Sequence, residues 1–575
     1  MNASLPTSAL DALEWSWAQY EPHFTQLAEA ELTIETLDEW MLSWSHLSKL
    51  AVEVFNRLYI ATTVDTNDQK AQDRYSAFLE GVYPQGKAAE QTLKEKLLDS
   101  GLQPENFSVQ LRNMRAEADL FAEANLPLLS QEQFLVAEHD KLTGAQTVEW
   151  EGEEITLPQV SLILQDQDRD KRERAWRGMM ARWQQDREAF NELWGRFMEL
   201  RGQIAANAEV DDYRAYRWHE LLRLDYTPED CLQFHDAIEQ VVVPVAQRIY
   251  AKRQEQMGLD SLRPWDVDVD PLDRSPLRPF SDADELIEKT GGIFDQVDPQ
   301  LGAYFNTMRE EHLLDLANRK GKAAGGYCED LPLVERPFIF MNAVGTHDDV
   351  QTMLHEFGHA LHAFESYKLP YAQQLQYGME IAEVASMSME LLTAPYLPES
   401  GGGFYSEADA ARARIEHLEG SLKFWPYMAV VDAFQHWVYL NHAAATDPAN
   451  CDAKWAELWD RFMKGLDWTG LEEEKATGWH RKLHIFQVPF YYVDYGLAQL
   501  GAAQVWANSL QDHAKALGQY RHALSLGATR TLPELFEAAG AKLAFDVDTL
   551  GPAVELMETT IEELEATTPS SLDQL

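Results

Sequence analysis

Residues 355–362 read His-Glu-Phe-Gly-His-Ala-Leu-His and contain the pattern HExxH. In a helix, His355 and His359 stand one turn apart and point the same way, so their imidazoles can share one Zn²⁺. Glu356 lies about 60° around the helix from His359, beside the expected metal rather than on it. The spacing therefore predicts a catalytic zinc site.

The sequence around this pattern has the period of an amphipathic helix. At 100° per residue, the three histidines His355, His359 and His362 fall on one side. The opposite arc is apolar and consists of Val350, Met353, Leu354, Phe357, Leu361 and Phe364. A plain solvated face would carry Lys, Gln and paired charges, so we favour a metal site over surface histidines.

A catalytic zinc needs a third protein ligand and an open position. His362 overshoots a metal held between the first two histidines, so a contact with substrate or with a ligand suits it better. The segment MEIAEVASMSMELL (379–392) predicts a second amphipathic helix with acids on its polar side. Glu383 lies at the centre of that side and is the expected ligand, with Glu380 near the edge as its rival.

Two further features have more than one interpretation. Glu390 lies two turns beyond Glu383, where it is either a surface acid or a group that orients a ligand imidazole. The segment 479–506 is either an aromatic core helix or a source of hydrogen-bond donors to an oxyanion opposite the zinc. The side chains concerned in that segment are His480, His484, Tyr491, Tyr492 and Tyr495.

The elements that must position these residues are mostly helical. Helical periodicity runs through 24–60, 64–100, 107–125 and 168–206, and again after residue 347. Three segments interrupt it. A hairpin around a Glu-Gly turn is expected within 145–165, and a Pro- and Asp-rich surface crossing within 257–281. A small β element, with Gly325-Gly326 and the run PFIFMN, is expected within 318–347.

Composition limits the possible partners and location. The chain has 575 residues, which suggests two to four structural units. Its net charge of −47 argues against binding to nucleic acid or to an anionic membrane surface. Three scattered cysteines indicate a reducing compartment, and no stretch resembles a secretory signal or a membrane span. We expect a cytoplasmic protein, of unknown oligomeric state.

With these segments in hand, the chain resembles the thimet oligopeptidase and oligoendopeptidase F family of zinc metallopeptidases. The family's HExGHxxH corresponds to residues 355–362, and its downstream [VA]ExxSxxxE setting to Glu383, Ser386 and Glu390. Its C-terminal His and Tyr-rich segment correspond to 484–495. Asp315–Thr346, the expected hairpin and the run DRDKRERAW are also similar. The resemblance covers nearly the whole chain and is densest from 315 to 500.

The resemblance implies a mainly helical, two-lobed shell around a deep channel, in which short unstructured peptides are cleaved at internal bonds. We expect an N-terminal helical domain (1–200) and a catalytic domain (201–575). His355, His359 and Glu383 would bind one Zn²⁺ per chain, and Glu356 would be the general base. His484 and Tyr495 would face the tetrahedral intermediate, with Tyr491 and Tyr492 as substrate-binding alternatives for the tyrosine.

Two rival functions stay open. A zinc carboxypeptidase of related helical fold would need a basic group for the substrate's terminal carboxylate, and the sequence does not identify one. A zinc-retaining but inactive peptide-binding protein is expected to lack the Glu after the first His, whereas Glu356 is present. We also expect the strand around Pro337–Asn342 to pair with the peptide backbone by strand addition.

Overall fold

The computed structural model describes residues 5–319, 321–323 and 325–567. This part of the chain is mainly helical, with five short strands in two separate sheets. The mainly helical fold predicted from the sequence is confirmed. None of the described helices combines the length and the apolar composition that a bilayer crossing requires.

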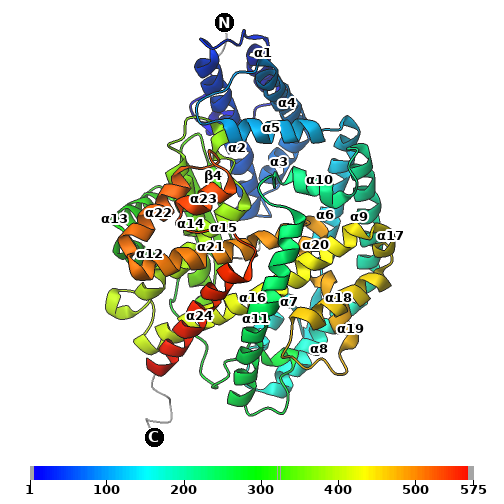
Figure 1. Ribbon diagram of the computed structural model, residues 1–575, viewed down its shortest axis with the longest axis vertical. Helices are drawn as coiled ribbons and strands as arrows, with labels where there is room; N and C mark the ends of the chain where they lie inside the picture. Colours follow the sequence, from blue (N-terminus) through cyan, green and yellow to red (C-terminus); the bar gives the residue numbers. More distant parts are fainter. Residues whose placement is uncertain (1–4, 320, 324, 568–575) are drawn as a thin grey trace.

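The first five helices gather at one end of the long axis (Figure 1). They are α1 (Trp17–Glu29), α2 (Leu37–Val64), α3 (Gln69–Gly81), α4 (Tyr83–Ser100) and α5 (Ser108–Leu120). These helices enclose their own apolar cluster, which includes Trp40 and Trp44. Helix α2 also reaches the rest of the molecule, because the buried carboxylate of Glu53 accepts the backbone N–H groups of Leu333 and Val334.

The hairpin expected within 145–165 consists of β1 (Thr147–Trp150) and β2 (Glu153–Thr156), paired antiparallel. Glu151 and Gly152 between them both have positive φ, 52° and 89°, as a two-residue type I′ turn requires. The neighbouring helices are α6 (Leu126–Gly144), α7 (Leu157–Ile163), α8 (Arg169–Gln185) and α9 (Arg187–Asn207).

Residues 257–281 are irregular as predicted, but the expectation of a surface crossing is wrong at their centre. Trp265 and Asp266 are buried. The Asp266 carboxylate pairs with Arg172 at 3.0 Å and with Arg169 at 2.7 Å, both on α8. Burial of a carboxylate needs such partners, and they come from a segment almost 100 residues earlier in the chain.

The small β element is a three-stranded sheet in the order β3-β5-β4. It consists of β3 (Leu314–Ala317), β4 (Tyr327–Leu331) and β5 (Arg336–Ala343), with β5 parallel to β3 and antiparallel to β4. Pro337–Asn342 therefore lies in the central strand. The expectation that this segment adds a peptide strand is wrong, because both sides of β5 already carry a neighbouring strand.

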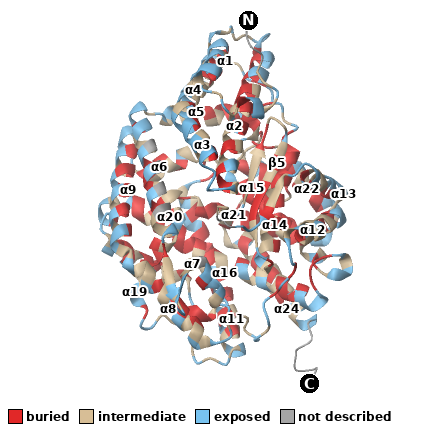
Figure 2. Ribbon diagram, turned by 180° about the vertical axis from the view of Figure 1, so that it is seen from behind, coloured by how far each residue is buried: buried red, intermediate tan, exposed pale blue. Residues whose placement is uncertain are grey.

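The remaining helices form the rest of the described molecule. They are α10 (Tyr213–Glu220), α11 (Pro228–Gln256), α12 (Ala283–Val297), α13 (Pro299–Glu310), α14 (His347–Ser366), α15 (Met379–Thr393), α16 (Glu407–Leu440), α17 (His442–Ala445), α18 (Pro448–Phe462), α19 (Glu472–Ala476), α20 (Leu483–Gln487), α21 (Tyr492–Gln511), α22 (His513–Ser525), α23 (Leu532–Ala538) and α24 (Val547–Thr567). Buried residues concentrate on the central elements, β5, α14 and α21 among them (Figure 2). These central elements thus form the buried core of the molecule.

Candidate active site

Helix α14 carries HEFGHALH and starts directly after β5. Gly345 has φ 92°, a conformation that favours glycine, and turns the chain into the helix. Thr346 caps α14 by accepting the N–H of Asp349, whose carboxylate accepts the N–H of Thr346 in return. The apolar arc predicted from the sequence is buried along its whole length. This packing fixes the direction of the opposite arc, which carries the histidines.

Gly358, inside the motif, allows α14 and α15 to approach closely. A Cβ at this position would lie 2.5 Å from the Cα of Ser386 and 2.7 Å from the carbonyl oxygen of Ala385. No side chain fits in that space. The glycine therefore brings the backbone of α15 against α14, within reach of the histidines on both sides of it.

His355, His359 and Glu383 converge across this contact. Glu383 Oε2 lies 3.4 Å from Nε2 of His355 and 3.8 Å from Nε2 of His359. One ligand atom from each residue falls within 4.8 Å of the other two. Two imidazoles and a carboxylate form the His₂Glu donor set of catalytic zinc. The two histidine side chains are 23% and 20% exposed, so the cluster is open on one side.

The charges in the cluster also suit a cation. Burial raises the pKa of Glu383, but its hydrogen bond with His355 and the nearby charge of His359 outweigh burial and lower this pKa to about 2. Burial lowers the pKa of His359 to about 4. At neutral pH Glu383 is thus a carboxylate and His359 a neutral imidazole, the forms that bind metal. Burial lowers the pKa of His355, but Glu383 and Glu390 outweigh burial and raise this pKa well above its usual range, so metal binding would release a proton from His355.

Glu390 contacts the same site from behind. Its Oε1 lies 2.6 Å from Nδ1 of His355, so the imidazole is held with Nε2 towards Glu383. Its other oxygen lies 3.5 Å from Nε2 of His417 on α16. This contact is one that sequence reasoning missed. His417 is 27 positions further along the chain, and no motif marks it.

Glu356 follows His355 on α14 and is buried, with 7% of its surface exposed. Burial raises its pKa to about 7, with the charge of His355 acting against this effect and those of Glu383 and Glu390 adding to it. A carboxyl group of this kind exchanges protons near neutral pH.

The segment 484–495 places aromatic groups against this cluster. The hydroxyl of Tyr491 donates to Oε1 of Glu383 at 3.2 Å. His484 and Tyr495 lie beside it, with ring centroids 6.0 Å and 5.1 Å from that of Tyr491. Tyr492 belongs to the same group, with its ring centroid 4.9 Å from that of His484, but it is buried and also packs against Phe424 and Tyr427.

The alternative ligands lie elsewhere. Glu380 accepts a hydrogen bond from the hydroxyl of Tyr226 at 2.7 Å and lies 3.7 Å from Nε of Arg223, which makes it part of a different polar network. His362 is buried and stacks on Tyr377, with ring centroids 3.6 Å apart. His480 is also buried, and its Nε2 lies 3.0 Å from Oδ1 of Asn191.

Comparison with known families assigns the chain to one of them. The model of peptidase family M3 matches residues 162–550, which include every residue of the site. The chain belongs to peptidase family M3. The sequence resemblance to the oligoendopeptidase F group is thereby confirmed.

Known relatives and a solved structure agree with this assignment. The chain is 26% identical to group B oligopeptidase PepB of Streptococcus agalactiae over 254 residues, 43% of this chain and 40% of that protein. It is 22% identical to the plasmid oligoendopeptidase F of Lactococcus lactis subsp. cremoris over 427 residues, 72% and 66% of the two chains. Both alignments thus span less than two-thirds of the relative. A structure of PZ peptidase A with an inhibitor aligns over 98% of this chain and 99% of that one, with a TM-score of 0.86 and 28% identity.

Proposed function

We propose that this protein is a zinc-dependent endopeptidase that hydrolyses internal peptide bonds of short, unstructured oligopeptides. The observation that carries this proposal is the convergence of His355, His359 and Glu383 in an open His₂Glu cluster. Membership of family M3 and the oligopeptidase names of its relatives support the substrate class.

In this proposal His355, His359 and Glu383 hold one catalytic zinc per chain, while Glu390 fixes the ring of His355. When bound, zinc supplies a Lewis acid that activates water and polarises the scissile carbonyl. Glu356 takes the proton from the attacking water and passes it to the leaving amine. Its position next to a ligand histidine, buried and not engaged as a ligand itself, supports this role.

His484 and Tyr495 are the proposed donors to the oxyanion of the tetrahedral intermediate. The contact of Tyr491 with Glu383 supports a location of the whole aromatic group next to the reacting bond. Besides its proposed contact with substrate, Tyr491 would orient the proposed ligand Glu383, because its hydroxyl donates to one oxygen of that carboxylate. Tyr492 is also a proposed substrate contact. Because it is buried among aromatic neighbours, we propose that the contact is made by its ring.

Metal analysis combined with peptide cleavage tests the proposal. The purified protein should cleave a short peptide blocked at both ends, lose this activity with a chelator and regain it with Zn²⁺. Glu383→Gln should lose most of the catalytic metal, whereas the matched variant Glu380→Gln should keep it. Loss of zinc from Glu380→Gln alone would overturn the ligand assignment. Cleavage only of peptides with a free C-terminus would indicate a carboxypeptidase.

The size of the substrate tests a second part of the proposal, a deep channel that admits extended chains only. A strand advances about 3.3 Å per residue, so a channel a few tens of ångströms deep holds roughly 5–20 residues. An unfolded chain of about 100 residues should therefore be cleaved much more slowly than a peptide of about 10 residues at equal molarity. Equal rates would favour an open cleft, with the same chemistry.

We further propose a division near residue 200 between an N-terminal helical part and the catalytic part. Helix α9 (Arg187–Asn207) runs through this position, so the two parts would share a helix. The three cysteines, Cys231, Cys328 and Cys451, are all free thiols, which supports a reducing compartment such as the cytoplasm.

A further inference from the structure

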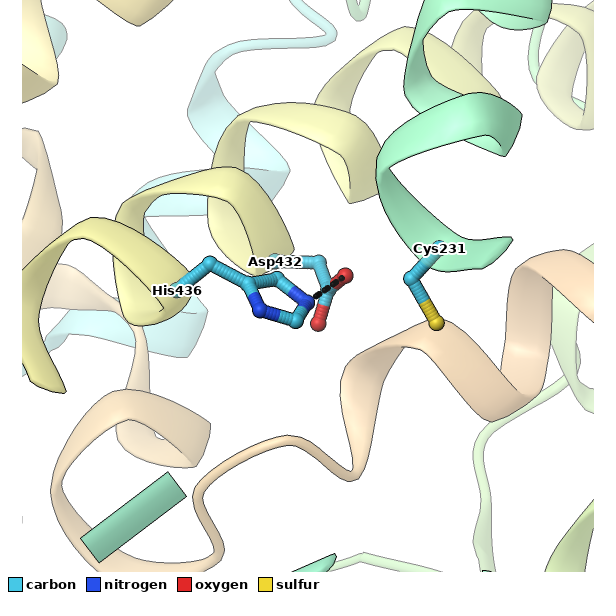
Figure 3. Close-up of side chains that lie close together, drawn as sticks. All are labelled: Cys231, Asp432 and His436. Atoms are coloured by element: carbon cyan, nitrogen blue, oxygen red, sulfur yellow. Dashed lines mark ion pairs between the residues drawn. The ribbon is translucent and has the colours of Figure 1, made fainter. Parts of the chain in front are cut away.

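A second group of metal-binding side chains lies between α11 and α16, outside the proposed active site. Cys231 and His235 stand one turn apart on α11, and Asp432 and His436 stand one turn apart on α16. Figure 3 shows Cys231 and His436 on either side of the Asp432 carboxylate. Two i, i+4 pairs on two packed helices bring four potential ligands into one region, and three of them, Cys231, Asp432 and His436, form a group that could hold a metal ion.

The distances within this group are short. Asp432 Oδ2 lies 2.9 Å from Nε2 of His235 and 3.2 Å from Nε2 of His436. The ligand atoms of Cys231, Asp432 and His436 all lie within 4.8 Å of one another. In a tetrahedral zinc site, neighbouring ligand atoms are about 3.5 Å apart. For these three residues, shifts of roughly 1 Å, within the reach of side-chain rotation, would give this spacing. His235, which contacts Asp432, would turn towards the ion as the fourth ligand.

The group is buried and leaves a polar atom without a partner. Cys231, His235, Asp432 and His436 are each at most 2% exposed. Within the described residues, Oδ1 of Asp432 has no hydrogen-bond partner, and Nε2 of His436 has only its 3.2 Å contact with Oδ2 of Asp432. Buried polar atoms are nearly always satisfied, so Oδ1 of Asp432 calls for a further partner such as a metal ion. The nearby cation Arg223 does not serve this atom, because it pairs with Asp494 on α21.

We propose that Cys231, His235, Asp432 and His436 bind a second metal ion, a structural Zn²⁺ that joins α11 to α16. One thiolate and one carboxylate balance the charge of the ion, and two imidazoles complete a closed set of four ligands. Nitrogen and sulfur donors select zinc over calcium or magnesium. Complete burial leaves no open position for water or substrate, so this site stabilises the fold and takes no part in peptide cleavage.

Metal binding requires one local rearrangement. Nδ1 of His436 lies 3.4 Å from Nη1 of Arg214. With zinc on Nε2, Nδ1 carries a proton and no longer accepts from an arginine. Arg214 has another partner within reach, since its Nη2 lies 3.9 Å from the carboxylate of Glu229. A small displacement of Arg214 towards Glu229, with which it is already paired, would make room for the proton on Nδ1.

Cobalt substitution separates the two sites, because only the second contains sulfur. The full-length protein, exchanged with Co²⁺, should bind two metal ions per chain and show the near-ultraviolet charge-transfer band of a cobalt–thiolate bond. Cys231→Ser should lose the band and one metal ion. Cys451→Ser, at an equally buried cysteine on α18, should keep both. These readouts do not depend on peptidase activity.

The wild-type protein alone can overturn the proposal, whether or not Cys231→Ser folds. A single metal ion per chain without a thiolate band would show that the group is only a hydrogen-bonded His–Asp–His network. A band that persists in Cys231→Ser would assign the thiolate to another cysteine. Glu383→Gln gives the complementary result, since it should lose the active-site metal and keep the band.

Discussion

Two clusters in this protein are built in the same way and differ in their access to solvent. Each takes a pair of proposed metal ligands one helical turn apart and adds groups from a second helix, α14 with α15 in one case and α11 with α16 in the other. In the first cluster His355 and His359 are 23% and 20% exposed. In the second, the side chains of His436 and Asp432 are 2% and 0% exposed.

This difference in exposure suits the open cluster to catalysis and the closed cluster to stabilising the fold. The open cluster has Glu356 beside it and the hydroxyl of Tyr491 on its carboxylate, so a substrate would meet acid–base and hydrogen-bonding groups there. The closed cluster is enclosed by packed helices and offers no room for a reacting molecule. A catalytic metal needs an open position, whereas a structural metal needs a complete set of ligands.

The largest effect is expected at Glu356. Glu356→Gln keeps the size of the side chain and removes the base, so kcat should fall by about 10²–10⁴-fold. Both metal contents and the thermal midpoint should stay at their wild-type values, because the residue is a ligand in neither cluster. Steady-state kinetics with metal analysis checks this. A kcat close to that of the wild type would show that Glu356 is not the general base, and this chemical distinction between the two clusters would be lost.

Asp432 should show the opposite pattern. It is fully buried and in contact with two histidines, so Asp432→Ala leaves both without their acidic partner. Breaking a buried pair of this kind costs about 3–5 kcal/mol of folding free energy. Thermal and denaturant unfolding should show a clear fall in stability, in contrast to Glu356→Gln. If Asp432→Ala unfolds like the wild type, the closed cluster does not hold the two helices together.

The sequence predicted the open cluster much better than the closed one, for a physical reason. HExxH places two ligands and a neighbouring acid within one turn of a single helix, so periodicity alone orients them. The choice between Glu383 and Glu380 was harder, because both lie near one side of α15. Their contacts with distant residues separate the two, since Glu383 reaches the histidines of α14 whereas Glu380 bonds Tyr226, about 150 residues earlier.

Long-range pairing explains what the sequence did not reveal. Cys231 and Asp432 are 201 positions apart, and each i, i+4 pair alone resembles ordinary core chemistry. The packing of α11 on α16 brings the two pairs together. The same limit applies to the strand at 336–343, whose run of apolar residues does not tell whether it is central or at an edge. Its buried position between β3 and β4 depends on residues that the run does not contain.

A smaller effect is expected at Glu390, which contacts His355 of the open cluster and His417 beside it. Glu390→Ala frees Nδ1 of His355, and loss of such an orienting group lowers metal affinity or activity by about 10–100-fold. Glu390→Gln keeps an acceptor oxygen and should lose less. Zinc titration against a competing chelator measures both variants. If both variants bind zinc as tightly as the wild type, Glu390 is an ordinary acid with no part in orienting His355. If the cobalt–thiolate band is lost from either variant, the two clusters depend on each other.

The smallest effect distinguishes the neighbouring tyrosines of the open cluster. Tyr491→Phe removes one hydroxyl that donates to Glu383 at 3.2 Å. A hydrogen bond of this length at a partly exposed position contributes about 1 kcal/mol, so zinc affinity should fall about fivefold. Tyr492→Phe is the matched control, because the ring of Tyr492 packs between Phe424 and Tyr427 and carries Lys482 Nζ 3.9 Å from its centroid. It should change zinc affinity less than twofold, since the phenyl ring keeps these contacts. The same chelator competition measures both variants. A larger loss in Tyr492→Phe would mean that the hydroxyl supporting Glu383 belongs to the other tyrosine, and the aromatic side of the open cluster would have to be reassigned.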